Sequence, residues 1–128
     1  MALLATTGCS THSIFLLKDK TTFTPIGDQK YPAHTNRVFI SHEPLPATMK
    51  AQVLGQVDAG TVMYNAFHIV YCRMAQKARD VGADAIFDAN VWYQPCGWAN
   101  ATPHGKGTAI KLMDGETPDF SSMKGDWF

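Results

Sequence analysis

A helical pattern between Thr61 and Val81 is the feature that most constrains the fold. At about 100° per residue, the apolar side chains of this stretch fall within about 60° of one direction, as in a helix with one face on a core. Gly82 follows directly and can end a helix in the left-handed conformation. The pattern predicts one helix with a buried stripe of Met63, Ala66, Phe67, Val70, Met74, Ala78 and Val81.

Short runs of strand-forming residues lie on both sides of this helix. Residues 37–41 and 50–60 precede it, and residues 85–93 and 107–113 follow it. Residues 94–106 contain several Pro and Gly residues, which is typical of a loop. This order predicts an α+β fold, a small β-β-α-β-β sandwich in which the helix covers one face of a mostly antiparallel sheet and the other face is open. We expect the helix to pack beside Val53, Val57, Ile86 and Ile110.

The segments outside the domain at residues 37–113 differ from it in composition. Residues 10–36 are rich in Thr, Lys, Asp and Pro and show no sustained period, which is typical of a linker, although SIFLL within it could dock as an edge strand. Residues 114–128 form a polar tail that ends with Trp127 and Phe128. Because a large aromatic side chain can bury about 150–250 Å², we expect both to dock either on the open sheet face of their own domain or on a partner.

Composition and motifs argue against several classes of function. Eleven Lys and Arg balance eleven Asp and Glu, so no net field attracts nucleic acid. No apolar stretch approaches the roughly 20 residues that cross a bilayer. GKGT at residues 105–108 lacks the spacing of a phosphate-binding loop, and Ser41, His42 and Glu43 are adjacent, whereas a catalytic triad is assembled in space. We therefore predict a protein that is not an enzyme and has no cofactor.

The stretch LLATTGCS has the composition that precedes the lipid-bearing cysteine of a bacterial lipoprotein, with Cys9 as the attachment residue. Residues 1–9 would then be a truncated signal. Only eight residues precede Cys9 and none is Lys or Arg, whereas a complete signal has a charged start and an apolar run of about 7–15 residues. Either the start has been placed too far downstream, or the likeness is accidental. In the first case a lipid on Cys9 would be the membrane attachment.

VLGQV, a helix ending in ARDVGADAI, and GTAIKL resemble the small domain shared by the YbjQ-like heavy-metal-binding family and the Rcs stress-sensing outer-membrane lipoprotein (RcsF-like). RVFISHEPLPATMKAQVLGQV is similar to the first half of that domain in envelope lipoproteins, and the match covers residues 37–113. The resemblance implies lipidated Cys9 and a location on the periplasmic face of the outer membrane. A likeness to the Rcs lipoprotein would also imply two disulfides, but only Cys96 stands where one of those cysteines would.

Metal binding and a disulfide compete for the same cysteine. His68 and Cys72 are four residues apart on the predicted helix, so both could face one ion. Zinc usually takes three or four protein ligands, and Cys96 and His104 lie far along the chain, so we predict no metal site and keep His68 and Cys72 as the candidates. A Cys72–Cys96 disulfide stays open, because it requires the loop to fold back until the Cα atoms are within about 7 Å.

The helix face opposite the core stripe carries little charge, which is typical of the centre of a protein contact. We therefore predict a contact with a partner, either an envelope protein or a second copy of the chain. The predicted contact residues are His68, Cys72, Ala75, Arg79, Trp127 and Phe128.

Two functions remain as hypotheses. The first is a non-enzymatic, lipid-anchored envelope protein whose α+β domain binds another protein as a structural or sensing component. The second, implied by the YbjQ-like resemblance, is a cytosolic homo-oligomer that binds a metal or a small ligand.

Overall fold

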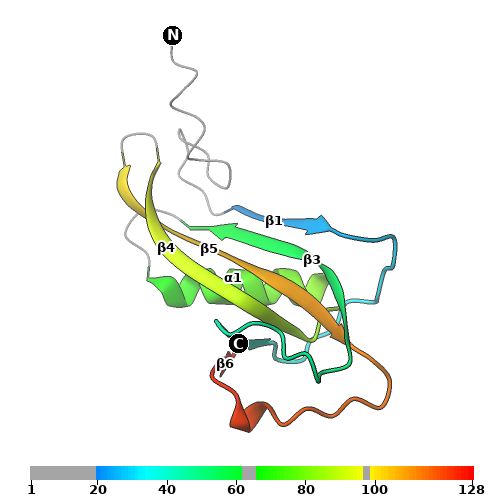
Figure 1. The fold of residues 1–128 in the computed structure, drawn as a ribbon. Coiled ribbons are helices and arrows are strands. Elements are labelled where there is room, and N and C mark those ends of the chain that lie inside the picture. Colours follow the sequence, from blue (N-terminus) through cyan, green and yellow to red (C-terminus); the bar gives the residue numbers. More distant parts are fainter. Residues whose placement is uncertain (1–19, 62–65, 97–98) are drawn as a thin grey trace.

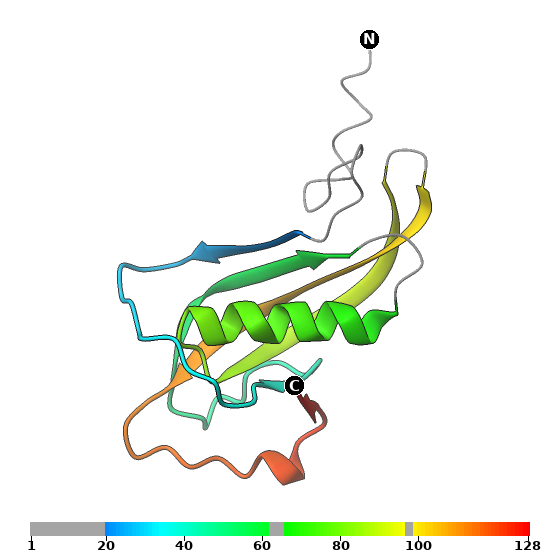
Figure 2. The same cartoon turned by 180° about the vertical axis from the view of Figure 1, so that it is seen from behind.

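A computed structural model describes residues 20–61, 66–96 and 99–128, without the side chains of residues 95, 96 and 99–101. One helix covers one face of a mixed six-stranded sheet of order β1-β3-β5-β4-β2-β6, and the sheet is not closed into a barrel (Figures 1 and 2). The predicted α+β class is confirmed. Neighbouring strands are antiparallel except β2 and β4, which are parallel. The elements are β1 (Lys20–Pro25), β2 (Phe39–Ile40), β3 (Ala51–Gly60), α1 (Phe67–Asp80), β4 (Ala85–Cys96), β5 (Ala99–Leu112), the 3₁₀ turn η2 (Phe120–Ser122) and β6 (Asp126–Trp127).

Helix α1 matches the predicted stripe in its middle and departs from it at both ends. Val70, Met74 and Ala78 are fully buried, as predicted. Ala66 is exposed because it lies in extended conformation before the first helical residue. Phe67 and Val81 are half-buried, and Met63 lies outside the described residues. Gly82 adopts φ +80° directly after the helix, which confirms its predicted role in ending it.

Two glycines of β5 form the seat on which the helix packs. A Cβ atom on Gly105 would lie 2.5 Å from Val70 Cγ1 and 2.9 Å from Met74 Sδ, and one on Gly107 would lie 3.2 Å from Met74 Cε. Larger residues would therefore push α1 away from the sheet. The GKG sequence, which does not fit a phosphate loop, has this packing role instead.

A bulge in β3 changes which residues face the helix. Val53 and Gly55 pair with Ile110 and Ala109, which leaves Leu54 as the additional residue. Leu54 packs in the core under the helix, whereas Val53 is 36 % exposed. Ile110 is buried on the opposite face of the sheet. The expected packing of α1 beside Val57 and Ile86 is confirmed, but the expectation for Val53 and Ile110 is wrong.

Most of the segment predicted to be a loop at residues 94–106 belongs to the long β4–β5 hairpin. Pro103 pairs with Tyr93, and its carbonyl accepts a hydrogen bond from Thr61 N at 3.1 Å. The missing N–H of Pro103 therefore points to the β3 side, where the last pair is Gly60 with His104. Proline is tolerated because this side of β5 is an edge.

The sheet face away from α1, which we call the far face, is covered over part of its area. Phe39, Phe87 and Ile110 are almost completely buried there. Leu45, Phe120 and Met123 pack over them from residues 41–49 and from the tail. The expectation of an open face is therefore wrong for this part of the sheet, because irregular segments supply apolar cover without any helical or strand period.

Part of the predicted linker is a strand. β1 pairs antiparallel with β3, from Lys20 with Gly60 to Pro25 with Gly55. Its sequence, KTTFT, is rich in Thr and Phe, and these residues favour strands. Ile26 N donates to Leu54 O, so by alternation the N–H of residue 25 would point away from β3. Pro25 therefore removes no hydrogen bond between β1 and β3. The SIFLL segment lies outside the described residues.

Candidate functional site

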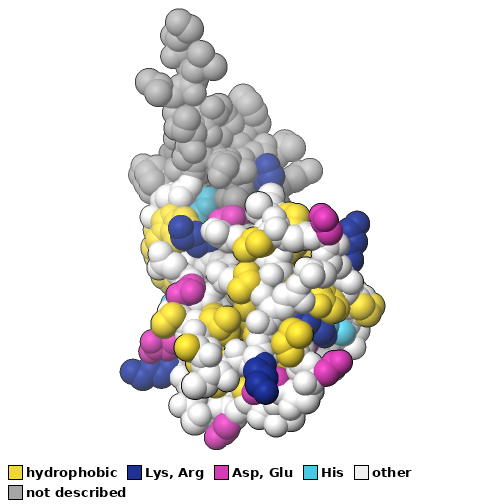
Figure 3. All heavy atoms as spheres, turned by 45° about the vertical axis from the view of Figure 1, so that its right-hand side comes forward, with side chains coloured by type: hydrophobic (Ala, Val, Ile, Leu, Met, Phe, Trp, Pro, Cys, Tyr) yellow, Lys and Arg dark blue, Asp and Glu magenta, His cyan; other side chains and the backbone are white. Residues whose placement is uncertain are grey.

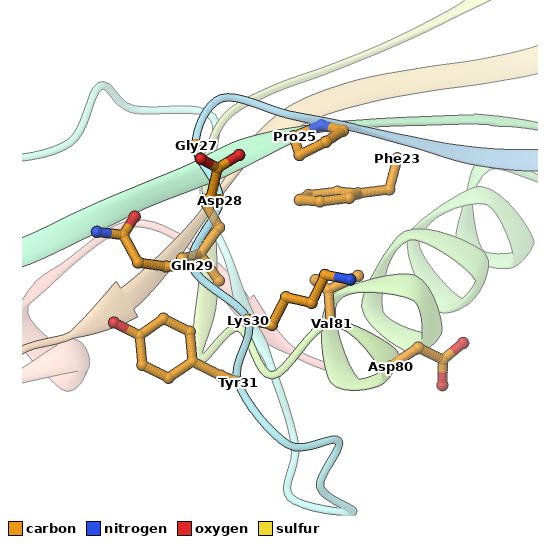
Figure 4. A pocket seen from close by; sticks show the side chains of 10 residues that line it. Phe23, Pro25, Gly27, Asp28, Gln29, Lys30, Tyr31, Asp80 and Val81 are labelled. Carbon is orange, nitrogen blue, oxygen red and sulfur yellow. The ribbon is translucent and has the colours of Figure 1, made fainter.

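A groove of about 630 Å³ lies between the end of β1, residues 26–31 and the C-terminal end of α1 (Figure 4). Phe23 and Pro25 line one side, and Val81 and Lys30 line the other. We call it the β1–α1 groove. Its lining residues are Phe23, Pro25, Gly27, Asp28, Gln29, Lys30, Tyr31, Leu54, Asp80 and Val81.

Tyr31 and Gly82 hold the segment that forms this groove against the body of the domain. Tyr31 Oη donates to Gln52 Oε1 at 2.5 Å, and Lys111 Nζ lies 5.5 Å from the centre of the Tyr31 ring. A Cβ atom on Gly82 would lie 2.6 Å from Tyr31 Cβ. Gly82 therefore has two roles, because it ends α1 and lets residues 31–32 pass closely beside it.

His34 fixes the continuation of this segment. Its Nε2–H donates to Ala83 O at 2.6 Å, so the other ring nitrogen, Nδ1, accepts from Asn36 N at 3.1 Å. His34 N also donates to Arg79 O at 3.2 Å. These contacts attach residues 31–36 to the end of the helix, so one wall of the groove is built on ordered backbone.

The groove combines an apolar floor with a charged rim. Phe23, Leu54 and Val81 supply apolar surface, while Asp28, Lys30 and Asp80 are exposed at the rim. Positive and negative side chains are also interspersed over the molecular face in Figure 3. Such a groove can take an apolar side chain of a partner, with polar contacts around it. Sequence reasoning missed the groove because residues 23–31, which supply most of its lining, lie in the predicted linker. The Thr-rich strand pattern of residues 20–25 and the turn-forming Pro25 and Gly27 were the available signals.

The helix flank predicted to contact a partner is covered by the end of the chain itself. Phe128 stacks on Tyr71 with ring centroids 5.2 Å apart, and Arg79 Nη1 donates to Phe128 O at 2.9 Å. Its ring lies 5.8 Å from that of His68. Ala75 is fully buried. The prediction of an open contact is therefore wrong for Ala75, which lies in the core cluster, and Phe128 packs on the neighbouring Tyr71 and Arg79 where the partner was expected.

Trp127 docks on the sheet face of its own domain, as predicted, whereas Phe128 docks on the flank of α1. β6 pairs with β2, placing Trp127 opposite Phe39, and Val38 and Phe128 exchange two backbone hydrogen bonds of 2.8 and 3.0 Å. Trp127 contacts Phe39 and Phe120 but stays 45 % exposed. Of the predicted contact residues, Trp127 retains the largest apolar area for a partner.

Tyr71 and His42 form a polar pair beside Phe128. His42 Nδ1–H donates to Ala89 O at 2.7 Å, so its Nε2 accepts from Tyr71 Oη, also at 2.7 Å. Burial raises the pKa of Tyr71, and the nearby charge of Asp126 raises this pKa further. Ser41, the neighbour of His42, donates its hydroxyl hydrogen to Lys124 O. These side chains hold the tail and the end of β2 in place.

The predicted metal and disulfide residues are only partly described. Cys72 Sγ lies 3.5 Å from His68 Nε2. Within residues 20–61, 66–96 and 99–128, no three His, Cys, Asp or Glu side chains group as metal ligands. His104 is buried and stacks on Trp92. Cys72 is a free thiol. A free Cys72 does not support the Cys72–Cys96 disulfide that the sequence left open; the side chain of Cys96 itself lies outside the described part. Lipidation of Cys9 stays a prediction, because Cys9 lies in the undescribed residues 1–19.

The described part of the chain holds no helix with the length and hydropathy that a membrane span needs.

No protein-family model matches the sequence, and no match to a curated protein was found. Among solved structures, the chain is similar to the crystal structure of the Francisella virulence factor FvfA, with a TM-score of 0.51 and 18 % identity. The similarity covers 72 % of this chain and 97 % of that one. At this identity the likeness shows a shared fold alone.

Proposed function

We propose that this chain is a non-enzymatic, lipid-anchored protein of the bacterial envelope whose α+β domain binds a protein partner. The observation that carries the proposal is the position of the lipoprotein-like Cys9, which only residues 10–19 separate from β1, the first strand of the described residues. A fully extended chain between Cys9 and Lys20 spans at most about 40 Å. A lipid on Cys9 would therefore hold the domain close to one leaflet, the periplasmic face of the outer membrane.

The position of the β1–α1 groove supports partner binding by an anchored domain. β1 starts at Lys20 and runs to Pro25, which lines the groove. The groove therefore lies at the end of β1 away from Cys9 and would face a partner in the periplasm. A protein that presents an apolar side chain flanked by polar groups fits its floor and rim.

The mass of the Cys9 peptide tests the anchor. The gene, with its upstream in-frame codons, would be expressed in a bacterium, and we expect the mature protein to begin at an acylated Cys9 and to enter the detergent phase. Cys9→Ser should prevent both, because the thiol is the acylation site. Recovery of intact, unmodified protein from the cytosol would contradict the anchor.

Site-specific photo-crosslinking tests the partner. A photoreactive residue at Gln29, on the groove, should give a discrete cross-linked product in cells, whereas the same residue at exposed Thr117 should not. Lys30 is exposed at the rim of the groove, so its charge can be reversed without disturbing Leu54 and Val81, which form the apolar floor. Lys30→Glu should weaken the cross-link from Gln29. Equal products from both positions, or none from either, would contradict partner binding in the groove.

One observation favours the alternative, a cytosolic YbjQ-like homo-oligomer that binds a small ligand or a metal. The groove volume of about 630 Å³ lies within the roughly 300–1,000 Å³ of small-molecule sites. Light scattering on the cytosolic protein, together with mass spectrometry under native conditions, distinguishes the two. A stoichiometric small molecule or metal in a symmetric oligomer would favour the alternative.

A further inference from the structure

The end of the domain opposite the groove is poor in charge. The sequence has no Asp, Glu, Lys or Arg in residues 59–72 or in residues 91–105. These stretches connect β3 to α1 and form the outer part of the β4–β5 hairpin. At the average charged content of 17 %, they would hold about five charged residues. We call this region the hairpin end and define its surface by the exposed Tyr93 and the half-buried Phe67 and Trp92.

Aromatic side chains are present on both sides of the hairpin end. Tyr93 is 53 % exposed, and its ring packs on Phe67 with centroids 4.4 Å apart. The preceding residue, Trp92, points to the other face, since side chains alternate along a strand. It stacks on His104 at 5.9 Å, and its indole Nε1 donates to Gln94 Oε1 at 2.8 Å. The hairpin end therefore carries rings that combine an apolar body with a polar atom.

The hairpin end is also where the described part of the chain begins. Lys20, the first residue of β1, pairs with Gly60, and Gly60 pairs with His104, which in turn pairs with Trp92. Figures 1 and 2 both place the start of β1 and the hairpin on the same end of the molecule, with β6 at the other end. The tether of at most about 40 Å from Cys9 thus attaches beside the uncharged, aromatic region.

We infer that the hairpin end lies in the lipid–water interface of the membrane, with a zwitterionic phospholipid surface as its binding partner. This inference rests on the proposed lipid anchor and deepens it. Tyr and Trp favour the interface because each combines an apolar ring with a polar O–H or N–H group. No carboxylate or ammonium of the hairpin end would be desolvated. The first charged residues of the neighbouring strands are Lys20, Asp58 and Lys106, and lysines can reach headgroup phosphates along their flexible stems.

Quenching of single tryptophans tests this orientation, because Trp92 lies on the hairpin, whereas Trp127 pairs with Phe39 beside Ala85, at the other end of β4. One protein would retain Trp92 alone (W98F/W127F), and the other Trp127 alone (W92F/W98F). Both would carry Cys72→Ala and Cys96→Ser and be coupled through Cys9 to a maleimide lipid in phosphatidylcholine vesicles with brominated acyl chains. We expect loss of most of the Trp92 emission and little change for Trp127. Equal quenching of the two, or none of Trp92, would overturn the inference.

Two substitutions to aspartate distinguish loss of the membrane contact from loss of folding. Tyr93 and Met113 are both exposed, at 53 % and 47 %, and lie at opposite ends of the sheet. Tyr93→Asp should restore the Trp92 emission of the coupled protein, while Met113→Asp should leave the quenching intact, with both variants giving the circular dichroism of the parent. Quenching that persists in Tyr93→Asp would refute the contact. Because the lipid is supplied chemically, these results do not depend on acylation in the cell, whose absence would contradict only the proposed function.

Discussion

The two faces of the sheet are covered in different ways. Helix α1 covers one face with a regular stripe that includes Val70, Met74 and Ala78. The far face is covered by single residues from irregular segments, among them Leu45, Phe120 and Met123. Both coverings bury side chains completely, as Met74 and Phe39 show. Burial therefore does not require a regular element, but only a regular element leaves a period in the sequence.

Loss of an aromatic ring from the far face should have the largest effect. Phe39 is 1 % exposed and contacts Phe87, Phe120 and Trp127, with ring centroids 6.2, 4.6 and 5.4 Å away. Phe39→Ala should lower the free energy of unfolding by about 3–5 kcal/mol, measured by urea denaturation. This would equal or exceed the cost of Met74→Ala on the helix face, about 2–5 kcal/mol. A cost below about 1 kcal/mol would mean that the irregular cover is loose.

A charge under Phe128 should have the next largest effect. Ala75 is fully buried in the cluster against which Phe128 packs, so Ala75→Glu would bury an unpaired carboxylate or displace residues that cover it. We expect the free energy of unfolding to fall by about 2–4 kcal/mol. Gln76→Glu, on the neighbouring exposed position, is the control and should stay within about 0.5 kcal/mol of the parent. A stable monomeric Ala75→Glu protein would show that Phe128 does not cover this flank in solution.

A methyl group on the helix seat should have a smaller effect. The added Cβ of Gly105→Ala would lie 2.5 Å from Val70 Cγ1, so α1 must shift, at a cost of about 1–3 kcal/mol. Lys106→Ala changes the adjacent exposed residue and serves as the control. Thermal unfolding followed by circular dichroism measures both. If Gly105→Ala were neutral, α1 could shift on the sheet without loss of stability, and its packing would be looser than that of the residues that cover the far face.

The smallest effect concerns pH. The pKa of Tyr71 is raised by burial and by Asp126, so its contribution to stability is complete below about 10 and is lost as pH rises through the higher folded-state value. Tyr71→Phe should lose about 0.5–1.5 kcal/mol at neutral pH with the hydrogen bond to His42. It should also flatten the decline of stability above pH 10, measured by denaturation at several pH values. A decline of unchanged slope would assign it to other tyrosines or lysines.

The contrast between the two faces explains what could be predicted from the sequence. Strand runs and the 3.6-residue period gave the α+β class, the helix and the role of Gly82, because these features repeat or terminate a repeat. The bulge at Leu54 could not be predicted, since VLGQV alternates equally well in either phase. The β1–α1 groove and the stacking of Phe128 on Tyr71 could not be predicted for a different reason. Each depends on where an aperiodic segment returns to the domain, and this position is set by tertiary contacts.

The pairing of β2 with β6 has a consequence for the order of folding. Phe39 and Trp127 are neighbours in the sheet but are separated by most of the chain, so their contact forms only after residues 126–128 have left the ribosome. Phe39, Val38 and the flank of α1 stay without their cover until then. Closing so long a loop is slow relative to local pairing. This part of the domain is therefore expected to stay incompletely folded until β6 has been synthesised and can pair with β2.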